Sequence, residues 1–391
     1  MKRIYFDYAA TTPIAPNVFK AMLPYLKEGY GNPSSIHSFG QKTRGAIDES
    51  RETIAEFLNS SPSEIYFTGS ATEANNTVIF GIKRANKDKK IHIITSKIEH
   101  EAVLNPLEEL EKEGVEVTYL KVNREGLIDI LDLEKNIKDN TVLVSIIYAN
   151  NEIGTIEDIK GIGKKLREIN ENRKEKIYFH TDAVQAVNYL QCDVNDLGVD
   201  LLTLSSHKIY GPKGIGALYI RKGTKIKPLI FGGGQEQGMR SGTENVSSIV
   251  GFAAAIKEVK KNRAKANTIK RLRDKLIKGI LKDIPYSMLN GSKDKRLINN
   301  INVSFKGAEG ESIVISLDQK GIAASTGSAC SSKSLEPSHV LLSLGLSHEE
   351  AHGSLRITLG RYTKELDINY LLKVLPGIIK NLRIISGFTK E

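Results

Sequence analysis

Short strand-like runs alternate with helix-like segments through the middle of this 391-residue chain, and this alternation limits its possible folds more than any other feature. The strand-like runs, rich in β-branched and aromatic residues, cover residues 64–69, 90–96, 142–149, 176–182, 200–206 and 216–222. Helix-like segments follow the first four runs, at residues 72–85, 100–114, 159–171 and 183–187. Such alternation is typical of βαβ units on a mostly parallel sheet, so we expect an α/β fold.

The sequence changes character near Asn245, where a long helical stretch at residues 247–281 is followed by a strand-like run and a shorter mixed region. A chain of this length also exceeds what one core usually covers. We therefore predict a large α/β domain over residues 14–260 and a small α+β domain formed by residues 1–13 and 261–391.

Cysteine content and hydropathy point to the cytoplasm and away from membranes. Two cysteines, Cys192 and Cys330, cannot form a disulfide framework, and the first residues contain no apolar signal-peptide core. No uncharged apolar run reaches the ~18 residues of a membrane helix.

The net charge of +10 could favour binding to nucleic acid, but much of the basic charge lies on predicted helix faces such as residues 83–90 and 257–273. Because no nucleic-acid-binding motif accompanies it, we expect a solvated surface and no nucleic-acid partner.

Polar residues gather where the predicted strands end, and in open α/β sheets ligands bind at the carboxyl ends of the strands. These junctions contain Gly69–Thr72, Glu99–His100, Asn150–Asn151, Asp182–Gln185 and Ser205–Lys208. At the first junction small residues precede a helix that begins near Thr72, so unpaired backbone N–H groups could cradle an anion, most simply phosphate. An ordinary N-cap at Ser70 or Thr72 explains this segment better when it is taken alone.

Three junctions together predict a site for pyridoxal phosphate. Asp182 could pair with a protonated ring nitrogen, Gln185 could face the same site, and Lys208 could form a Schiff base with the aldehyde. His100 could stack on the ring. Each residue alone has a plainer explanation as a helix cap or a solvated charge. An anion cradle, a carboxylate and a lysine on successive strands are the parts that hold this cofactor.

Cys330 lies in a run of small and polar residues, about 324–338, that has no hydrophobic periodicity. We interpret this run as a mobile, exposed loop, on which a thiol would be accessible for nucleophilic chemistry. Cys192 has no such context and is expected to be inert and partly buried.

In the small domain, Arg356 could bind a substrate carboxylate through two N–H groups or simply face solvent, and the sequence around it leaves both possibilities open.

One metal-binding pattern has a poor context. His348 and His352 match the H-E-x-x-H zinc signature, but a Gly-Ser pair ends the segment at once and no third ligand is evident downstream. We predict no resident metal, and a zinc hydrolase is the alternative that metal analysis would test.

With these residues in view, the sequence resembles the cysteine desulfurases of the NifS/IscS type, pyridoxal-phosphate enzymes of the class-V aminotransferase family. The resemblance runs through YFDYAATTP, FTGSATEANN, NNEIGT, HTDAVQAV, SSHKIYGPKGIGALY, the cysteine loop STGSACSSKSLEPSHVL and LRITLGRYT. Individually some of these segments are weak, but in this order and spacing they are specific, and they span nearly the whole chain. The resemblance implies an aspartate-aminotransferase-like fold (pyridoxal-phosphate fold type I), whose large domain holds a mostly parallel seven-stranded sheet.

The same resemblance implies a role for each cofactor-binding residue. Lys208 would hold pyridoxal phosphate covalently, Asp182 would pair with its pyridinium nitrogen and Gln185 would hydrogen-bond its ring oxygen. His100 would stack on the ring and shuttle protons. The phosphate would be held by Ala71, Thr72, Ser205, Ser206 and His207, with Thr243 reaching in from the partner subunit of a homodimer.

Substrate binding and sulfur transfer are implied in the same way. Asn151, close to the cofactor, and Arg356 would bind the carboxylate of L-cysteine. The Cys330 thiolate would attack the substrate sulfur, which leaves L-alanine and a persulfide that supplies an iron–sulfur scaffold or another sulfur-acceptor protein. Cys330 is also a candidate transient ligand of an iron–sulfur cluster. A selenocysteine lyase or an aminotransferase of the same fold is the nearest alternative, and the aminotransferase would not need Cys330.

The sequence departs from the family pattern at three places. The pair Gly69-Ser70 reverses the commoner order, Gln237 stands where Arg is frequent, and Thr326 replaces a frequent Ser. The first could alter the phosphate cradle and the second could alter dimer or substrate-access contacts, but none removes a chemical role.

Overall fold

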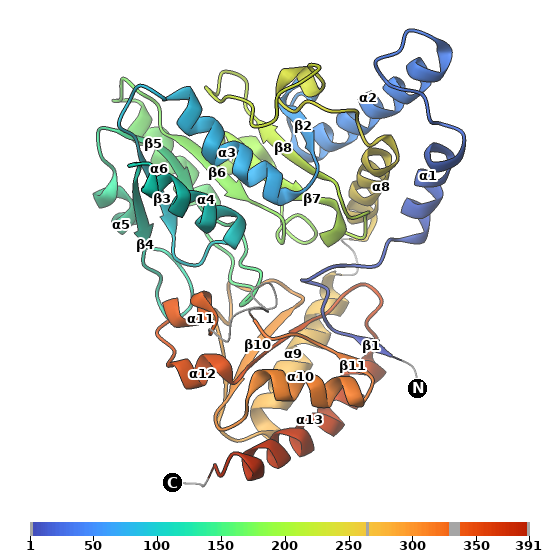
Figure 1. Ribbon diagram of the computed structural model, residues 1–391. Coiled ribbons are helices and arrows are strands. Elements are labelled where there is room, and N and C mark those ends of the chain that lie inside the picture. The colour runs from blue at the N-terminus through green and yellow to red at the C-terminus, as the bar shows by residue number, and fades with distance from the viewer. Residues whose placement is uncertain (1–2, 263–265, 328–336, 389–391) are drawn as a thin grey trace.

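The computed structural model describes residues 3–262, 266–327 and 337–388 (Figure 1). A seven-stranded sheet with strand order β2-β8-β7-β6-β5-β3-β4 forms the larger part. Its strands are β2 (Ile65–Thr68), β3 (His92–Ser96), β4 (Glu116–Leu120), β5 (Thr141–Ser145), β6 (Tyr178–Asp182), β7 (Leu201–Ser205) and β8 (Gly216–Ile220). Only β8 pairs antiparallel, with both β2 and β7. The predicted α/β class and mostly parallel sheet are confirmed.

Helices cover both faces of this sheet, which is why β3, β5, β6, β7 and β8 are buried at every position. On one face, α3 (Ala71–Ala85) and α4 (Glu101–Lys112) share a hydrophobic cluster with β3, β5 and β8. On the other, α6 (Ile159–Asn170) packs on β5, β6 and β7 in a larger cluster that also includes α2 (Ser38–Leu58) and α8 (Val246–Asn262). The remaining helices of this part are α1 (Pro16–Lys27), α5 (Ile130–Asn136) and α7 (Val194–Leu197), with short 3-10 turns at Pro62–Glu64, Ser206–Lys208 and Glu236–Gly238.

A third hydrophobic cluster, formed by Phe6 and by buried residues between Ile269 and Ile379, lies in the smaller part, below the large sheet in Figure 1. Its antiparallel sheet has the order β12-β10-β9, from β12 (Ser354–Thr358), β10 (Asn300–Phe305) and β9 (Ser287–Leu289). The N-terminal β1 (Ile4–Tyr5) pairs with β11 (Ile322–Ala323). The helices are α9 (Ala266–Asp283), α10 (Gly310–Gln319), α11 (His339–Ser343), α12 (His348–His352) and α13 (Glu365–Ile385).

The structure differs locally from the sequence analysis. Residues 183–187 lie in a series of turns rather than a helix, because bonds such as Val187 N to Ala183 O do not form a continuous helical series. The helical stretch predicted at 247–281 is confirmed for its described residues, which lie in α8 and α9 on either side of the undescribed residues 263–265. The sequence analysis did not predict the edge strand β4, because this strand is only partly buried and lacks a long apolar run. Within the described ranges, no helix has the length and apolar character to cross a bilayer.

Candidate active site

A cavity of about 510 Å³ lies at the carboxyl ends of the parallel strands. Its lining includes, among the residues predicted from sequence, Ala71, Thr72, His100, Asn151, Asp182, Gln185, Ser205, His207, Lys208 and Arg356. These residues come from segments far apart in the chain, and the parallel sheet brings most of them to one edge. The cavity is therefore the candidate active site.

Three predicted residues are not part of this lining. Ser206 directs its buried hydroxyl toward Gly211, since a Cβ added at Gly211 would lie 1.9 Å from Ser206 Oγ. Thr243 is exposed and does not border the cavity of its own chain. Cys330 lies outside the described residues.

The start of α3, where the sequence predicts an anion cradle, borders the cavity. Ser70 is the N-cap, and its Oγ accepts a hydrogen bond from the backbone N–H of Glu73 at 3.1 Å. The helix begins at Ala71, so its first N–H groups and its positive end border the cavity. Gly216 of β8 allows this close approach, because a Cβ there would lie 2.7 Å from the carbonyl carbon of Ser70. The cap and the cradle, which the sequence presented as alternatives, are therefore compatible.

His207, beside this cradle, is held neutral. Burial, with Lys208 and Lys213 nearby, lowers the pKa of His207 to about 4. Its Nδ1 lies 3.1 Å from Thr11 Oγ1, so the ring is held by a hydrogen bond at the cavity edge. A neutral ring can contribute a hydrogen bond to an anion but no positive charge.

Lys208 follows β7 and extends into the cavity. Its Nζ donates hydrogen bonds to the backbone oxygens of Ala9 and Ala10, both at 2.7 Å. Gln185 Nε2 also donates to Ala9 O, at 3.0 Å. The YFDYAATTP segment thus holds two of the predicted site residues through its main chain, a role that side-chain identity does not indicate.

Asp182, at the end of β6, is buried and held in one orientation by two donors. Its Oδ1 accepts from the Val184 N–H at 3.0 Å, and its Oδ2 accepts from Asn75 Nδ2 at 2.7 Å. Asn75 Oδ1 is buried and has no hydrogen-bond partner in the described part of the chain. Asn75 was missed from sequence, although its place one helical turn after Thr72 puts it on the same side of α3.

His100 caps α4 and borders the cavity as a neutral ring. Its Nδ1 accepts a hydrogen bond from the Ala102 N–H at 3.0 Å. Burial lowers the pKa of His100, and Asp182 opposes this shift while Lys208 adds to it. Because Nδ1 is an acceptor, the single proton of the neutral ring lies on Nε2.

Arg356, on β12, brings a guanidinium from the smaller part of the protein to the cavity. It is buried, and it donates to Asp7 Oδ1 at 3.0 Å and to the backbone oxygen of Asn151 at 3.1 Å. Its buried Nε has no partner among the residues the structure describes. Of the two readings that the sequence left open, the structure thus supports a cavity-facing Arg356. Asp7 was missed because its partner is 349 residues away in sequence.

These groups fit pyridoxal phosphate. The cavity combines an amine at Lys208, a buried carboxylate at Asp182 and a helix start suited to phosphate. The unpartnered Asn75 Oδ1 and Arg356 Nε show that hydrogen-bonding capacity is left over at this end of the sheet. For the described residues, no cluster of three His, Cys, Asp or Glu side chains is placed to hold a metal ion, and this includes the His348–His352 segment.

Comparisons with known proteins identify the family of this chain. The model of the class-V aminotransferase family matches residues 4–371. A protein named cysteine desulfurase IscS from Clostridium botulinum is 53% identical, over 100% of this chain and 98% of its own length. The structure of a NifS-like protein superposes with a TM-score of 0.88 at 36% identity, covering 99% of this chain and 100% of that one. A structure described as SspA in complex with cysteine has a TM-score of 0.81 at 39% identity, with coverages of 92% and 100%. The chain therefore belongs to the class-V aminotransferase family, as one of its cysteine desulfurases of the NifS/IscS type.

Proposed function

We propose that this protein is a pyridoxal-phosphate-dependent cysteine desulfurase, which converts L-cysteine to L-alanine and passes the sulfur to an acceptor. The observation that carries this proposal is the cavity in which the Lys208 amine, the Asp182 carboxylate and the Arg356 guanidinium meet. An aldehyde-reactive amine, a partner for a ring nitrogen and a carboxylate receptor are what such a reaction needs. The relatives with this name, and the solved relative described as a cysteine complex, support the choice of substrate.

Each side chain has a defined task in this proposal. When bound, pyridoxal phosphate supplies an electron sink that loosens bonds at the substrate α-carbon. Lys208 holds its aldehyde and moves the α-proton, while Asp182 keeps the ring nitrogen protonated. The start of α3, with Ser205 and His207, holds the phosphate, and Gln185 binds the ring oxygen. The neutral His100 stacks on the ring and donates from Nε2.

Substrate orientation depends on the other side of the cavity. Arg356 and Asn151 receive the carboxylate of L-cysteine, so the substrate must share the Arg356 guanidinium with Asp7, which already accepts one of its N–H groups. Cys330, assigned from sequence, takes the sulfur. In the balanced step, L-cysteine and the Cys330 thiol become L-alanine and a Cys330 persulfide, with the C–S electron pair staying on carbon and taking up a proton.

The assembly and its partners are also part of the proposal. A homodimer in the cytoplasm would let Thr243 of one subunit complete the phosphate site of the other, in keeping with its exposure and its distance from its own cavity lining. The persulfide would pass its outer sulfur to an iron–sulfur scaffold or another acceptor protein.

Quantifying alanine and sulfide together tests the activity. With L-cysteine and a thiol reductant, the cofactor-loaded protein should yield the two in equal amounts. The Cys330→Ala variant should keep the coloured cofactor and release little or no sulfide, while Cys192→Ala, at a buried site away from the cavity, should retain turnover. Normal sulfide release by Cys330→Ala would refute the persulfide step, and a keto-acid product instead of alanine would indicate an aminotransferase.

A further inference from the structure

Both ends of the segment that carries Cys330 meet on one buried side chain, Glu152. Cys330 itself is outside the described residues, but Gly327 and Ser338 bracket it in the chain. The Ser338 hydroxyl donates a hydrogen bond to Glu152 Oε2 at 2.5 Å. A Cβ added at Gly327 would lie 2.6 Å from the same Oε2, so the glycine backbone packs directly on this carboxylate. One oxygen atom therefore contacts both stems of the segment.

Glu152 is itself held rigidly from several sides. Its backbone N–H donates to Asn150 Oδ1 at 2.8 Å, and its backbone oxygen accepts from the side chains of Asn300 and Asn302, both at 3.1 Å. Both asparagines lie on β10, in the small antiparallel sheet. The Glu152 side chain is buried, and burial raises its pKa, which the Ser338 hydrogen bond opposes. A carboxyl group fixed in this way can define the position of whatever binds it.

The same turn also reaches the substrate side of the cavity. The residue before Glu152, Asn151, accepts a hydrogen bond from Arg356 through its backbone oxygen. Two residues before Gly327, Ser325 pairs its backbone with that of Arg356, with N···O distances of 2.7 and 3.2 Å. The stem of the cysteine segment and the proposed carboxylate receptor are thus parts of one hydrogen-bonded unit.

We propose that Glu152 is a positioning residue for sulfur transfer, which fixes Gly327 and Ser338, the described residues on either side of Cys330 in the chain, relative to the substrate site at Asn151 and Arg356. This inference rests on the proposed function. Glu152 touches neither substrate nor cofactor, since it is not part of the cavity lining. Its loss should therefore slow the step that needs Cys330 and spare the steps that precede it.

The test separates these steps in the cofactor-loaded enzyme. Glu152→Leu keeps the side-chain volume but removes the acceptor, so kcat for sulfide and alanine formation should fall about tenfold or more. The KM for L-cysteine and the rate of the absorbance change on adding L-cysteine should stay within about threefold of the wild-type values. Glu152→Gln keeps one acceptor oxygen and should recover most of the activity. Equal loss in all these measurements would overturn the proposal.

Two further variants keep the test decisive if Glu152→Leu folds poorly. Ser338→Ala removes the donor and should lower kcat about threefold in the wild-type background but have no added effect beside Glu152→Leu, because both changes break the same bond. Glu157→Leu removes another buried carboxylate of the same loop, which accepts from the Ile128 N–H instead, and should leave kcat unchanged. Additive losses, or a loss of kcat in Glu157→Leu, would show that Glu152 has only a structural role. Failure of the wild type to form alanine and sulfide would instead refute the proposed function.

Discussion

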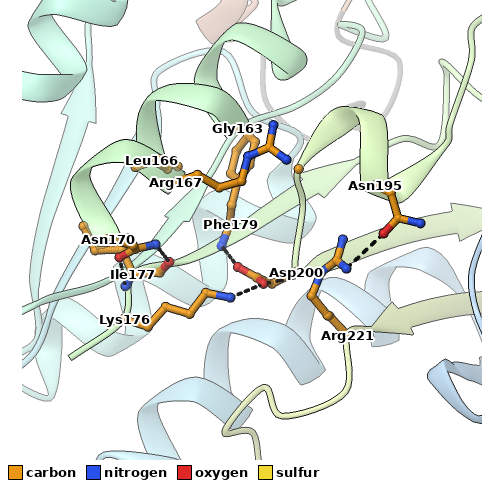
Figure 2. Close-up of a pocket in the computed structure, with 11 residues that line it drawn as sticks. Gly163, Leu166, Arg167, Asn170, Lys176, Ile177, Phe179, Asn195, Asp200 and Arg221 are labelled. Atoms are coloured by element: carbon orange, nitrogen blue, oxygen red, sulfur yellow. Dashed lines mark hydrogen bonds and ion pairs between the residues drawn. The ribbon is translucent and has the colours of Figure 1, made fainter. Parts of the chain in front are cut away.

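Strands β6 and β7 have a pocket at each end, and the two pockets differ in how their polar groups are satisfied. The pocket at the amino end measures about 290 Å³ (Figure 2). There Asp200 accepts hydrogen bonds from Lys176 Nζ at 2.6 Å and from the Phe179 N–H at 3.0 Å. Arg221 is held by Asn195 Oδ1 and by backbone oxygens, and the side chain of Asn170 pairs with the backbone of Ile177.

The pocket at the carboxyl end leaves buried polar atoms without partners. Asn75 Oδ1 and Arg356 Nε, both on its lining, have no hydrogen-bond partner among the described residues, whereas no lining atom of the amino-end pocket is in that state. Buried polar atoms are nearly always hydrogen-bonded in native proteins. Unpaired ones therefore indicate either a ligand-binding site or local strain. Of these two pockets, the one at the carboxyl end is therefore the one whose lining has hydrogen-bonding capacity left for a ligand.

Removing a lysine from each pocket should give the largest contrast. We expect Lys208→Ala to abolish turnover and covalent retention of the cofactor, because both the proposed bond to the aldehyde and the proposed proton transfer depend on its amine. Lys176→Ala removes a half-exposed partner of Asp200 and should leave kcat unchanged, at a stability cost of about 1 kcal/mol. Absorbance of the gel-filtered protein and sulfide release measure both variants. Measurable turnover in Lys208→Ala would contradict the conclusion that only the pocket at the carboxyl end is needed for the reaction.

Several residues found from sequence share one property, which is a chemically distinctive side chain at the end of a strand or a few residues after it. Lys208, Asp182 and His100 are of this kind, and parallel strands bring their carboxyl ends to one edge without any knowledge of contacts. Asn75, Asp7 and Glu152 could not be found in this way. Asn75 acts through a partner 107 residues away, and Asp7 through one 349 residues away.

The errors in the sequence analysis have a related cause. The apolar pattern of residues 183–187 suggested a helix. In the structure these residues form turns after Asp182, and most of their apolar side chains pack in the large hydrophobic cluster. Ser206 follows β7 just as Lys208 does, yet its hydroxyl points toward Gly211. Local pattern thus predicts which segments border the site, whereas side-chain direction depends on tertiary packing.

Two buried aspartates at opposite ends of neighbouring strands offer an intermediate test. Asp182→Asn should lower kcat about 100-fold or more, because an amide cannot stabilise a positively charged ring nitrogen as a carboxylate does. Asp200→Asn should leave kcat per folded molecule unchanged and should lower the free energy of unfolding by about 2 kcal/mol, since it weakens the hydrogen bonds that the buried Asp200 carboxylate accepts from Lys176 and from the Phe179 N–H. Steady-state kinetics and urea denaturation of both variants provide the measurements. A kinetic defect in Asp200→Asn would remove the distinction between the two ends.

The smallest expected effect on turnover concerns Glu99, which precedes His100, is buried and does not line the cavity. Its Oε1 accepts from Ser96 Oγ at 2.6 Å and from the Ile147 N–H at 2.9 Å, while its buried Oε2 has no partner in the described residues. Burial, reinforced by Asp182 and Glu157, raises the pKa of Glu99 to about 8. Glu99 is therefore protonated in the folded protein at neutral pH, although it is ionised in the unfolded chain.

Between the unfolded pKa of roughly 4.3 and the folded value, the folded state holds one more proton, so the free energy of unfolding should fall as the pH rises through this interval. Glu99→Gln has no proton to lose, so its free energy of unfolding should fall by about 3 kcal/mol less than that of the wild type between pH 5 and pH 8 in urea denaturation. Parallel stability curves for the two proteins would contradict this expectation. Because Asp200→Asn should weaken the protein and Glu99→Gln should strengthen it at high pH, the two variants together test whether the stability cost of a buried carboxyl group depends on how fully its oxygens are hydrogen-bonded.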